Sequence, residues 1–239
     1  MADYEFDRSR LESRARDLIP RCKEDRTVVV EFAGSPKAGK TTTIDIVTHF
    51  FKRMGFKVWA PTEGASKRTP YHLKRDLVAF NTWSLNYAIS ELLVAFNNVD
   101  KQDLIILDRG PFDSLAWMSL LKDEGKLTDS EFRIIKDFAL HPKWGELVSR
   151  ANLFVCDPKI SLQRELSHKL THVSGNAMND DMLAKLCGCY ERLSQEIGDK
   201  YPVAKFDTTK SDGPLRVAES IATDILELIE SGRKEQPQG

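Results

Sequence analysis

The sequence predicts an α/β fold of three layers, a doubly wound parallel sheet of about five strands with helices on both faces. Short β-branched, apolar segments alternate along the chain with longer segments of helical periodicity. Right-handed crossovers between such segments bring the strands into one parallel sheet. A chain of 239 residues also suits one sizeable domain better than two small ones.

Five segments have the composition of buried strands. They are residues 27–33, 56–60, 103–107, 152–156 and 203–206. The helical patterns lie between and after them, at residues 40–54, 81–98, 111–123, 129–140, 159–171, 179–199 and 213–230. We see no internal repeat and no low-complexity segment, so these elements belong to one domain.

We expect residues 26–231 to form that main domain. Residues 1–25 are charge-rich with apolar positions at helical spacing, which predicts an N-terminal amphipathic helix packed on the outside. Residues 232–239 are polar and predict a flexible tail. The stretch 164–176 runs from a helix into a polar, glycine-containing loop, which fits a lid that closes over a bound ligand.

The overall composition excludes several classes of protein. A net charge of −1, from 35 basic and 36 acidic residues, gives no indication of a nucleic-acid partner. No apolar run approaches the ~18 residues of a membrane span, and the charged amino terminus has no secretory signal. Four cysteines do not form a disulfide framework here, so we expect a cytoplasmic protein. The sequence leaves a homodimer possible.

A glycine-rich loop follows directly after the first predicted strand. It matches the pattern GxxxxGK[ST] with Gly34, Ser35, Pro36, Lys37, Ala38, Gly39, Lys40 and Thr41, and Thr42 comes next. Glycines let backbone N–H groups turn toward phosphate oxygens, and the helix that follows adds its positive end. Lys40 then reaches the β- and γ-phosphates of ATP, and the Thr41 hydroxyl is a ligand for Mg²⁺. The alternative is a plain glycine turn, but the strand before and the helix after favour a nucleotide site.

The third predicted strand ends in an acid, Asp108. An acid at that edge of the sheet holds Mg²⁺ through water. The next residue is Arg109, at a position where ATP-hydrolysing motors usually have a glutamate that activates water. An arginine binds phosphate, so it suits a site that clamps two phosphates together. The alternative interpretation is a surface Asp–Arg pair that closes a strand.

Two weaker patterns indicate other ligands. Residues 209–212 are similar to a guanine-reading NKxD motif, but the spacing after Asp108 fails the companion DxxG motif by one residue. Four candidate zinc ligands match no usual zinc spacing; they are His168, His172, Cys187 and Cys189. ATP is therefore favoured over GTP, and Mg²⁺ over zinc.

The order of these motifs resembles the thymidylate kinase and deoxynucleoside kinase group of P-loop kinases. The resemblance rests on the phosphate loop, on Glu63 after the second strand, and on Asp108-Arg109 with Ser114. The segment from Cys156 to Arg164 also looks like the strand and helix that lead into the lid of that group. The resemblance spans about residues 27–230, and it implies a nucleotide-kinase-like P-loop fold that transfers phosphoryl groups from ATP with Mg²⁺.

Two positions depart from thymidylate kinases. The segment 62–65 reads Thr-Glu-Gly-Ala where Arg-Glu-Pro-Gly is common, so an acceptor-site arginine is missing there. Gly110 stands where a tyrosine usually follows the Asp-Arg pair. Both departures concern the acceptor, and they leave its identity open.

The candidate acceptor site follows the second predicted strand. Glu63 lies at the edge of the sheet that borders the ligand crevice, where a carboxylate can take a proton from an attacking hydroxyl. Arg68 and Arg75, near Lys67, can hold an acceptor phosphate, or they form a solvated face. Trp83 can stack on a base, or it belongs to the core.

We therefore expect an ATP-dependent kinase that transfers the γ-phosphoryl group to a nucleoside monophosphate, with a nucleoside or nucleotide as its partner. The catalytic candidates are Lys40, Glu63, Asp108, Arg109 and Arg164, the last of which would neutralise charge from the lid. The alternatives are a deoxynucleoside kinase, a kinase of a non-nucleotide small acceptor, and a regulatory P-loop NTPase or switch.

Overall fold

A computed structural model describes residues 8–22, 27–61, 68–167, 179–210 and 213–231. Its centre is a five-stranded parallel sheet in the order β2-β3-β1-β4-β5, which confirms the predicted fold class. The strands are β1 (Val28–Gly34), β2 (Val58–Trp59), β3 (Leu104–Asp108), β4 (Arg150–Val155) and β5 (Val203–Asp207).

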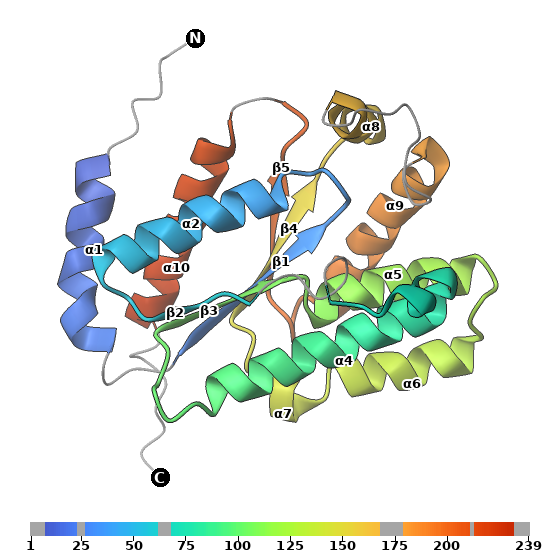
Figure 1. Ribbon diagram of the computed structural model, residues 1–239, viewed down its shortest axis with the longest axis horizontal. Helices are drawn as coiled ribbons and strands as arrows, with labels where there is room; N and C mark the ends of the chain where they lie inside the picture. The colour runs from blue at the N-terminus through green and yellow to red at the C-terminus, as the bar shows by residue number, and fades with distance from the viewer. Residues whose placement is uncertain (1–7, 23–26, 62–67, 168–178, 211–212, 232–239) are drawn as a thin grey trace.

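Helices cover both faces of this sheet (Figure 1). One face carries α1 (Arg8–Cys22), α2 (Lys40–Met54) and α10 (Pro214–Ser231). The other carries α4 (Leu77–Phe96), α5 (Pro111–Asp123) and α9 (Asp180–Ile197). Outside these lie α6 (Asp129–Ala139), which packs on α5, and the short α7 (Pro142–Gly145), which packs on α4.

The alternation of side chains along β1 divides the core between the two faces. Val28, Val30 and Phe32 pack with α1, α2 and α10, while Val29 and Ala33 pack with α4, α5 and α9. All seven residues of β1 are buried, as expected for the central strand of a parallel sheet.

Most predicted elements form within a few residues of their predicted bounds, and the differences have local causes. Strand β2 pairs over two residues instead of five. Helix α4 begins four residues early, because the Asp76 side chain accepts from the amides of Val78 and Ala79 and caps it there. The short helix η1 (Tyr71–Arg75) and α7 were not predicted. Helix α8 spans Pro158–Ser167.

Some of the predicted segments extend beyond the described residues. The predicted lid, residues 164–176, lies within them only at its start, and the tail 232–239 lies outside them entirely. Helix α1 begins at Arg8 and packs on α10 and α2. The division of the chain at residues 25 and 231 stays a prediction. No helix in the described part of the chain combines the length and apolarity that crossing a bilayer requires.

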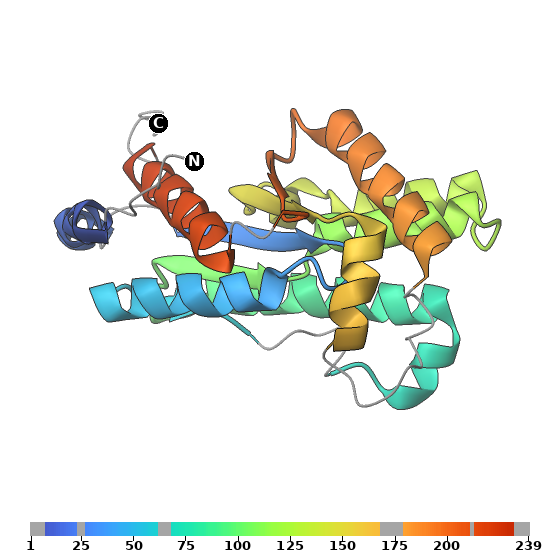
Figure 2. The same cartoon turned by 90° about the horizontal axis from the view of Figure 1, so that it is seen from above.

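The strand order places one end of β1 at a switch point of the sheet. The connection from β1 leads to β2 on one side of the sheet, whereas the connection from its neighbour β3 leads to β4 on the other side, which opens a crevice at the carboxyl ends of these strands. Helix α8 lies beyond those strand ends in both views (Figure 2). The phosphate loop follows β1, and Asp108 ends the adjacent β3. The fold therefore brings both motifs to one edge.

A carboxylate inside the central strand fixes the start of α5. Glu31 of β1 has no exposed surface, and its Oε1 accepts from the amides of Gly110 and Asp113 at 2.9 and 2.8 Å. Its Oε2 accepts from the Phe112 amide at 3.2 Å and from the Tyr201 hydroxyl at 2.6 Å. Helix α5 has no side-chain cap of its own at Gly110, so Glu31 supplies the cap from another element.

The same carboxyl group has a shifted titration. The pKa of Glu31 is raised from 4.5 to about 7, chiefly by burial and to a smaller degree by the charge of Asp113, while the bonds from Tyr201 and the Asp113 amide oppose the shift. Burial first, and then the Glu31 charge, raise the pKa of Tyr201 well above its usual value, so this hydroxyl stays protonated as a donor.

A first prediction concerns Gly110. A methyl group there would lie 2.6 Å from the Glu31 carboxyl carbon, and that carboxylate cannot move without losing its bonds to α5. We expect Gly110→Ala to lower the free energy of unfolding by about 2–4 kcal/mol. Gly125→Ala is the control, because φ there is 70° but no atom lies within 4 Å of the added methyl group, and it should cost about 1 kcal/mol. Equal losses in urea unfolding would contradict the packing argument.

A second prediction follows from the pKa of Glu31. Since the folded pKa is raised, the folded protein holds this proton where the unfolded chain has lost it, so the contribution of Glu31 to stability decreases as pH rises from 4.5 to about 7. The stability difference between the parent and Glu31→Gln should therefore shrink over that window by about 3 kcal/mol.

Urea unfolding of both proteins at several pH values measures this difference. Glu131→Gln is the control of opposite sign, because bonds from the Thr128 backbone and side chain lower the pKa of Glu131, and its contribution is lost as pH falls. A difference for Glu31→Gln that grows with pH would show that Glu31 is ionised throughout.

Candidate functional site

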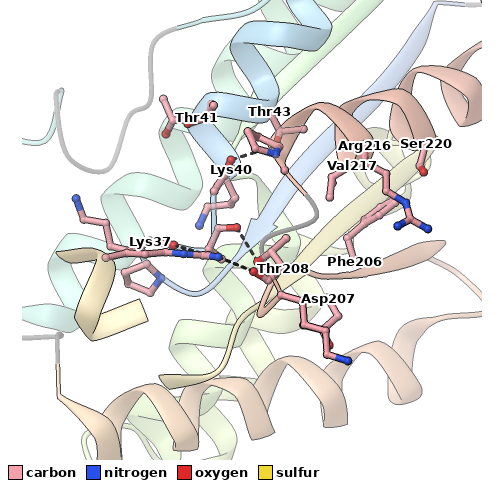
Figure 3. Close-up of a pocket in the computed structure, with 18 of the residues that line it drawn as sticks. Lys37, Lys40, Thr41, Thr43, Phe206, Asp207, Thr208, Arg216, Val217 and Ser220 are labelled. Atoms are coloured by element: carbon pink, nitrogen blue, oxygen red, sulfur yellow. Dashed lines mark hydrogen bonds between the residues drawn. The ribbon is translucent and has the colours of Figure 1, made fainter. Parts of the chain in front are cut away.

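A cavity of about 920 Å³ opens where the phosphate loop leaves β1. Residues 36–43 and Asp108 and Arg109 line one part of it, and residues of β5, of α10 and of the loop between them line another (Figure 3). Arg164 of α8 also lines it. The cavity thus lies at the switch point of the sheet, where the topology predicts a ligand.

The phosphate loop is built so that its backbone surrounds an anion. Gly34 has φ 135°, and a Cβ at this position would lie 2.1 Å from the backbone oxygen of Phe154 on β4, so only glycine fits. The Lys40 ammonium donates to the backbone oxygens of Gly34 and Ser35, at 2.8 Å each. Helix α2 begins at Lys40 and points its positive end at the cavity. These features fit the predicted nucleotide site.

Two non-glycine residues in the described part of the chain have a positive φ, and both line this cavity. They are Lys37 in the phosphate loop, at 59°, and Arg109 after β3, at 66°. Left-handed backbone costs energy at any residue but glycine, and where it persists it is associated with functional sites. Both residues are also basic, so each strained position brings a positive charge to the cavity.

The cavity is strongly basic in a nearly neutral protein. Seven of its lining residues are basic, namely Lys37, Lys40, Arg109, Arg164, Lys205, Lys210 and Arg216, and two are acidic, namely Asp108 and Asp207. The net charge of the chain is −1, so this balance is local. A concave site lined in this way attracts a polyanion such as a nucleoside triphosphate.

Arg109 is held in place by a buried acid. Its Nη1 donates to Asp113 Oδ2 at 2.7 Å, and the Asp113 side chain is only 2% exposed. Asp113 Oδ1 accepts from the Gly34 amide at 2.9 Å and from the Tyr190 hydroxyl at 2.6 Å. The first glycine of the phosphate loop and the arginine after β3 therefore share one carboxylate.

Arg164 lies in helix α8, and its donors go to backbone and sulfur. Its Nη2 donates to the Thr208 oxygen at 2.7 Å, and its Nη1 lies 3.3 Å from Cys156 Sγ and 3.4 Å from the Lys37 oxygen. The Thr208 hydroxyl donates to the Ala38 oxygen at 2.9 Å. These bonds tie α8, the phosphate loop and the end of β5 together, and the predicted role of Arg164 in charge neutralisation stays a prediction.

The predicted metal ligands face one cavity. Thr41 and Asp108 both line it, and a hydroxyl with one carboxylate is a donor set that suits Mg²⁺, which takes its other ligands from phosphate and water. In the described part of the chain, no three His, Cys, Asp or Glu residues are placed to hold a metal by themselves. His168 and His172 of the weaker zinc pattern lie outside the described residues.

Three of the predicted acceptor residues, Arg68, Arg75 and Trp83, do not line this cavity, whereas Arg109 does. Arg68 and Arg75 are exposed, and the ring of the half-buried Trp83 stacks on Tyr87 with centroids 5.3 Å apart. Burial and the charge of Glu91 raise the pKa of Tyr87, against the opposing charge of Arg68. Glu63 lies outside the described residues. The structure therefore describes the donor half of the predicted site more fully than the acceptor half.

Sequence reasoning missed the buried network behind the cavity. Its members are Glu31, Asp113, Tyr190 and Tyr201. One signal was present, because Glu31 is the single charged residue in an otherwise apolar strand, and a buried charge requires partners. The weaker guanine motif, residues 209–212, lies only in part within the described residues, and there Thr209 Oγ1 accepts from the Asp157 amide.

Comparison with known proteins shows similarity of fold. No protein-family model and no curated protein matches the sequence. Among solved structures, deoxyadenosine kinase from M. mycoides with bound dCTP matches at a TM-score of 0.59 and 14% identity, over 84% of this chain and 99% of that chain. The same enzyme with bound dATP matches at 0.58 and 15%, over 84% and 100%. The predicted likeness to P-loop deoxynucleoside kinases is thus confirmed at the level of fold.

Proposed function

We propose that this protein is a kinase that transfers the γ-phosphoryl group of ATP to a hydroxyl group of a deoxynucleoside. The observation that carries the proposal is the basic cavity at the switch point, where a complete phosphate loop and the Asp108-Arg109 pair face each other. The fold matches support it, since they are kinases of a nucleoside and are covered almost entirely by this chain. This choice replaces the nucleoside monophosphate as the favoured acceptor.

The half of the site that would bind ATP has the groups needed to position a triphosphate. Backbone amides of residues 36–41 and the Lys40 ammonium bind the phosphates, and the end of the cavity beside β5 and α10 has room for the base and sugar. Thr41 and Asp108 would hold Mg²⁺, which supplies neutralisation of charge between the β- and γ-phosphates. The protein then contributes orientation and electrostatics, with no covalent intermediate.

Arg109 stabilises the negative charge that develops between the γ-phosphate and the acceptor during transfer. Its guanidinium is planar and carries a fixed charge, so two of its N–H groups can contact oxygens of donor and acceptor together. Its backbone is held by a bond from its own amide to the Phe32 oxygen at 3.0 Å. A donor that is oriented before the reaction costs no reorganisation during it.

A nucleoside monophosphate kinase is the second candidate. Arg68 and Arg75 favour it, because they bring positive charge to the segment that precedes α4. Both side chains are exposed, however, and exposed charges bind phosphate less well than enclosed ones. A nucleoside also agrees with the missing acceptor-site arginine at residue 62.

A third prediction tests the acceptor class directly. With MgATP and a panel of deoxynucleosides, ribonucleosides and their monophosphates, we expect ADP release and a phosphorylated product with at least one deoxynucleoside. Lys40→Ala, which removes the phosphate-binding ammonium, should reduce transfer at least 100-fold. Lys52→Ala is the matched control, since it makes the same change on the exposed last turn of α2. Product formed only from monophosphates would favour the second candidate, and no product from any acceptor would contradict both.

A fourth prediction uses Glu63 to separate the two acceptors. A neutral hydroxyl must lose its proton as it attacks, whereas a phosphate acceptor is already an anion. If Glu63 is the base for a nucleoside, Glu63→Gln should reduce kcat by about 100-fold or more with little change in the KM for ATP. A loss of less than about fivefold would contradict Glu63 as the base for a hydroxyl acceptor.

A further inference from the structure

One buried carboxylate, Asp113, joins the two parts of the site that handle phosphate. It belongs to the first turn of α5, whose start is fixed by Glu31. Its Oδ1 holds the Gly34 amide, where the phosphate loop begins, and its Oδ2 holds the Arg109 guanidinium. The carboxylate does not line the cavity, so it acts on a ligand only through other residues.

Asp113 has little freedom to move. Its side chain is 2% exposed, and the Tyr190 hydroxyl donates to Oδ1 at 2.6 Å from helix α9. Burial first, and then the Asp113 charge, raise the pKa of Tyr190 well above its usual value, so the phenol remains a donor. With Oδ1 fixed by two donors, Oδ2 is fixed as well, at 2.7 Å from Arg109.

Arg109 needs such a partner. Its side chain is 18% exposed at the rim of the cavity, and a long side chain there loses rotamer freedom when it is held in one orientation. A charge-assisted bond to a buried carboxylate is strong enough to hold it. The left-handed backbone at Arg109 fixes the direction in which its side chain leaves the main chain, and Asp113 fixes the position of its guanidinium.

We propose that Asp113 is a positioning residue for phosphoryl transfer, which holds the Arg109 guanidinium in its productive orientation relative to the phosphate loop. The inference rests on the proposed function, since the productive orientation is the one that contacts the transferred group. It goes beyond that function because it assigns a role to a buried residue that contacts no ligand.

The substitution Asp113→Asn distinguishes the positioning of Arg109 from a contribution of Asp113 to folding. The asparagine has the same shape, and its oxygen can still accept from the Gly34 amide and the Tyr190 hydroxyl. Its amide group would then face Arg109, so that two donors meet and the ion pair is lost. The phosphate loop keeps its bond while the arginine loses its ion pair with residue 113.

The test is a double-mutant cycle on kcat with the acceptor that the panel identifies. In the parent background, Asp113→Asn should reduce kcat about 10- to 100-fold and change the KM for ATP by less than about threefold. In the Arg109→Ala background, the same substitution should reduce kcat by less than about threefold, because the group that Asp113 positions is absent. Equal losses in the two backgrounds would overturn the proposal, and so would a parent-like kcat for Asp113→Asn.

Asp123→Asn is the matched control. Asp123 lies on the same helix α5, and its carboxylate also pairs with a residue of α9, Arg192, but it is remote from the cavity. Its substitution should leave kcat unchanged. If Asp113→Asn does not fold, Asp113→Ser replaces it in the cycle, because a serine side chain is small enough for the site and removes the carboxylate from Arg109.

A chemical readout keeps this proposal distinct from the proposed function. Phenylglyoxal modifies accessible arginines, and peptide mass spectrometry gives the rate at each one without any turnover. Asp113→Asn should speed modification of Arg109 at least about fivefold relative to Arg164 in the same cavity, and Asp123→Asn should not. If no acceptor is phosphorylated, the proposed function fails, and this rate alone decides whether Asp113 holds Arg109. An unchanged rate at Arg109 would overturn the positioning proposal whatever the activity.

Discussion

The buried carboxylate of Glu31 is the interaction on which the rest of the site depends. A charge in the middle of a central strand costs several kcal/mol unless its hydrogen bonds are complete. Here three amides at the start of α5 and the Tyr201 hydroxyl supply them. The cap fixes α5 against β1, and Gly110 is the residue that leaves room for the carboxylate. Any side chain at this position would bring its Cβ to 2.6 Å from the Glu31 carboxyl carbon.

The fixed helix α5 in turn holds the phosphate-binding groups in place. Asp113 is in the first turn of α5, and it holds both Gly34 and Arg109. Lys37 and Arg109 keep left-handed backbones, which persist only where the surroundings determine them. Lys37 is paired with the buried Glu165 of α8 at 3.1 Å, and Arg109 with Asp113. Each strained residue therefore has a buried acid as its partner, and the charge that the cavity needs is held in place before a ligand arrives.

The two halves of the proposed reaction are built differently. The donor half is formed by the ends of β1, β3 and β5, and the hydrogen bonds of Arg164 and Thr208 tie the phosphate loop to α8 and β5. The predicted acceptor half belongs to the segment between β2 and α4, where β2 pairs over only two residues. The donor half is therefore positioned by strand ends within the paired sheet, whereas the strand that precedes the acceptor segment pairs only briefly.

The sequence by itself determined the elements and the phosphate loop, because both are local. Helical and strand periodicity, the Asp108-Arg109 pair and the GxxxxGK[ST] pattern are each read within a few consecutive residues. Tertiary structure decided the rest. Glu31 meets its partners 79 to 170 residues away in the chain, and Asp113 meets Tyr190 across 77 residues. The sequence shows that a buried Glu31 needs donors, but only the packing of α5, α9 and β1 determines which donors lie within hydrogen-bonding distance, since a hydrogen bond depends on position in space and not on separation along the chain.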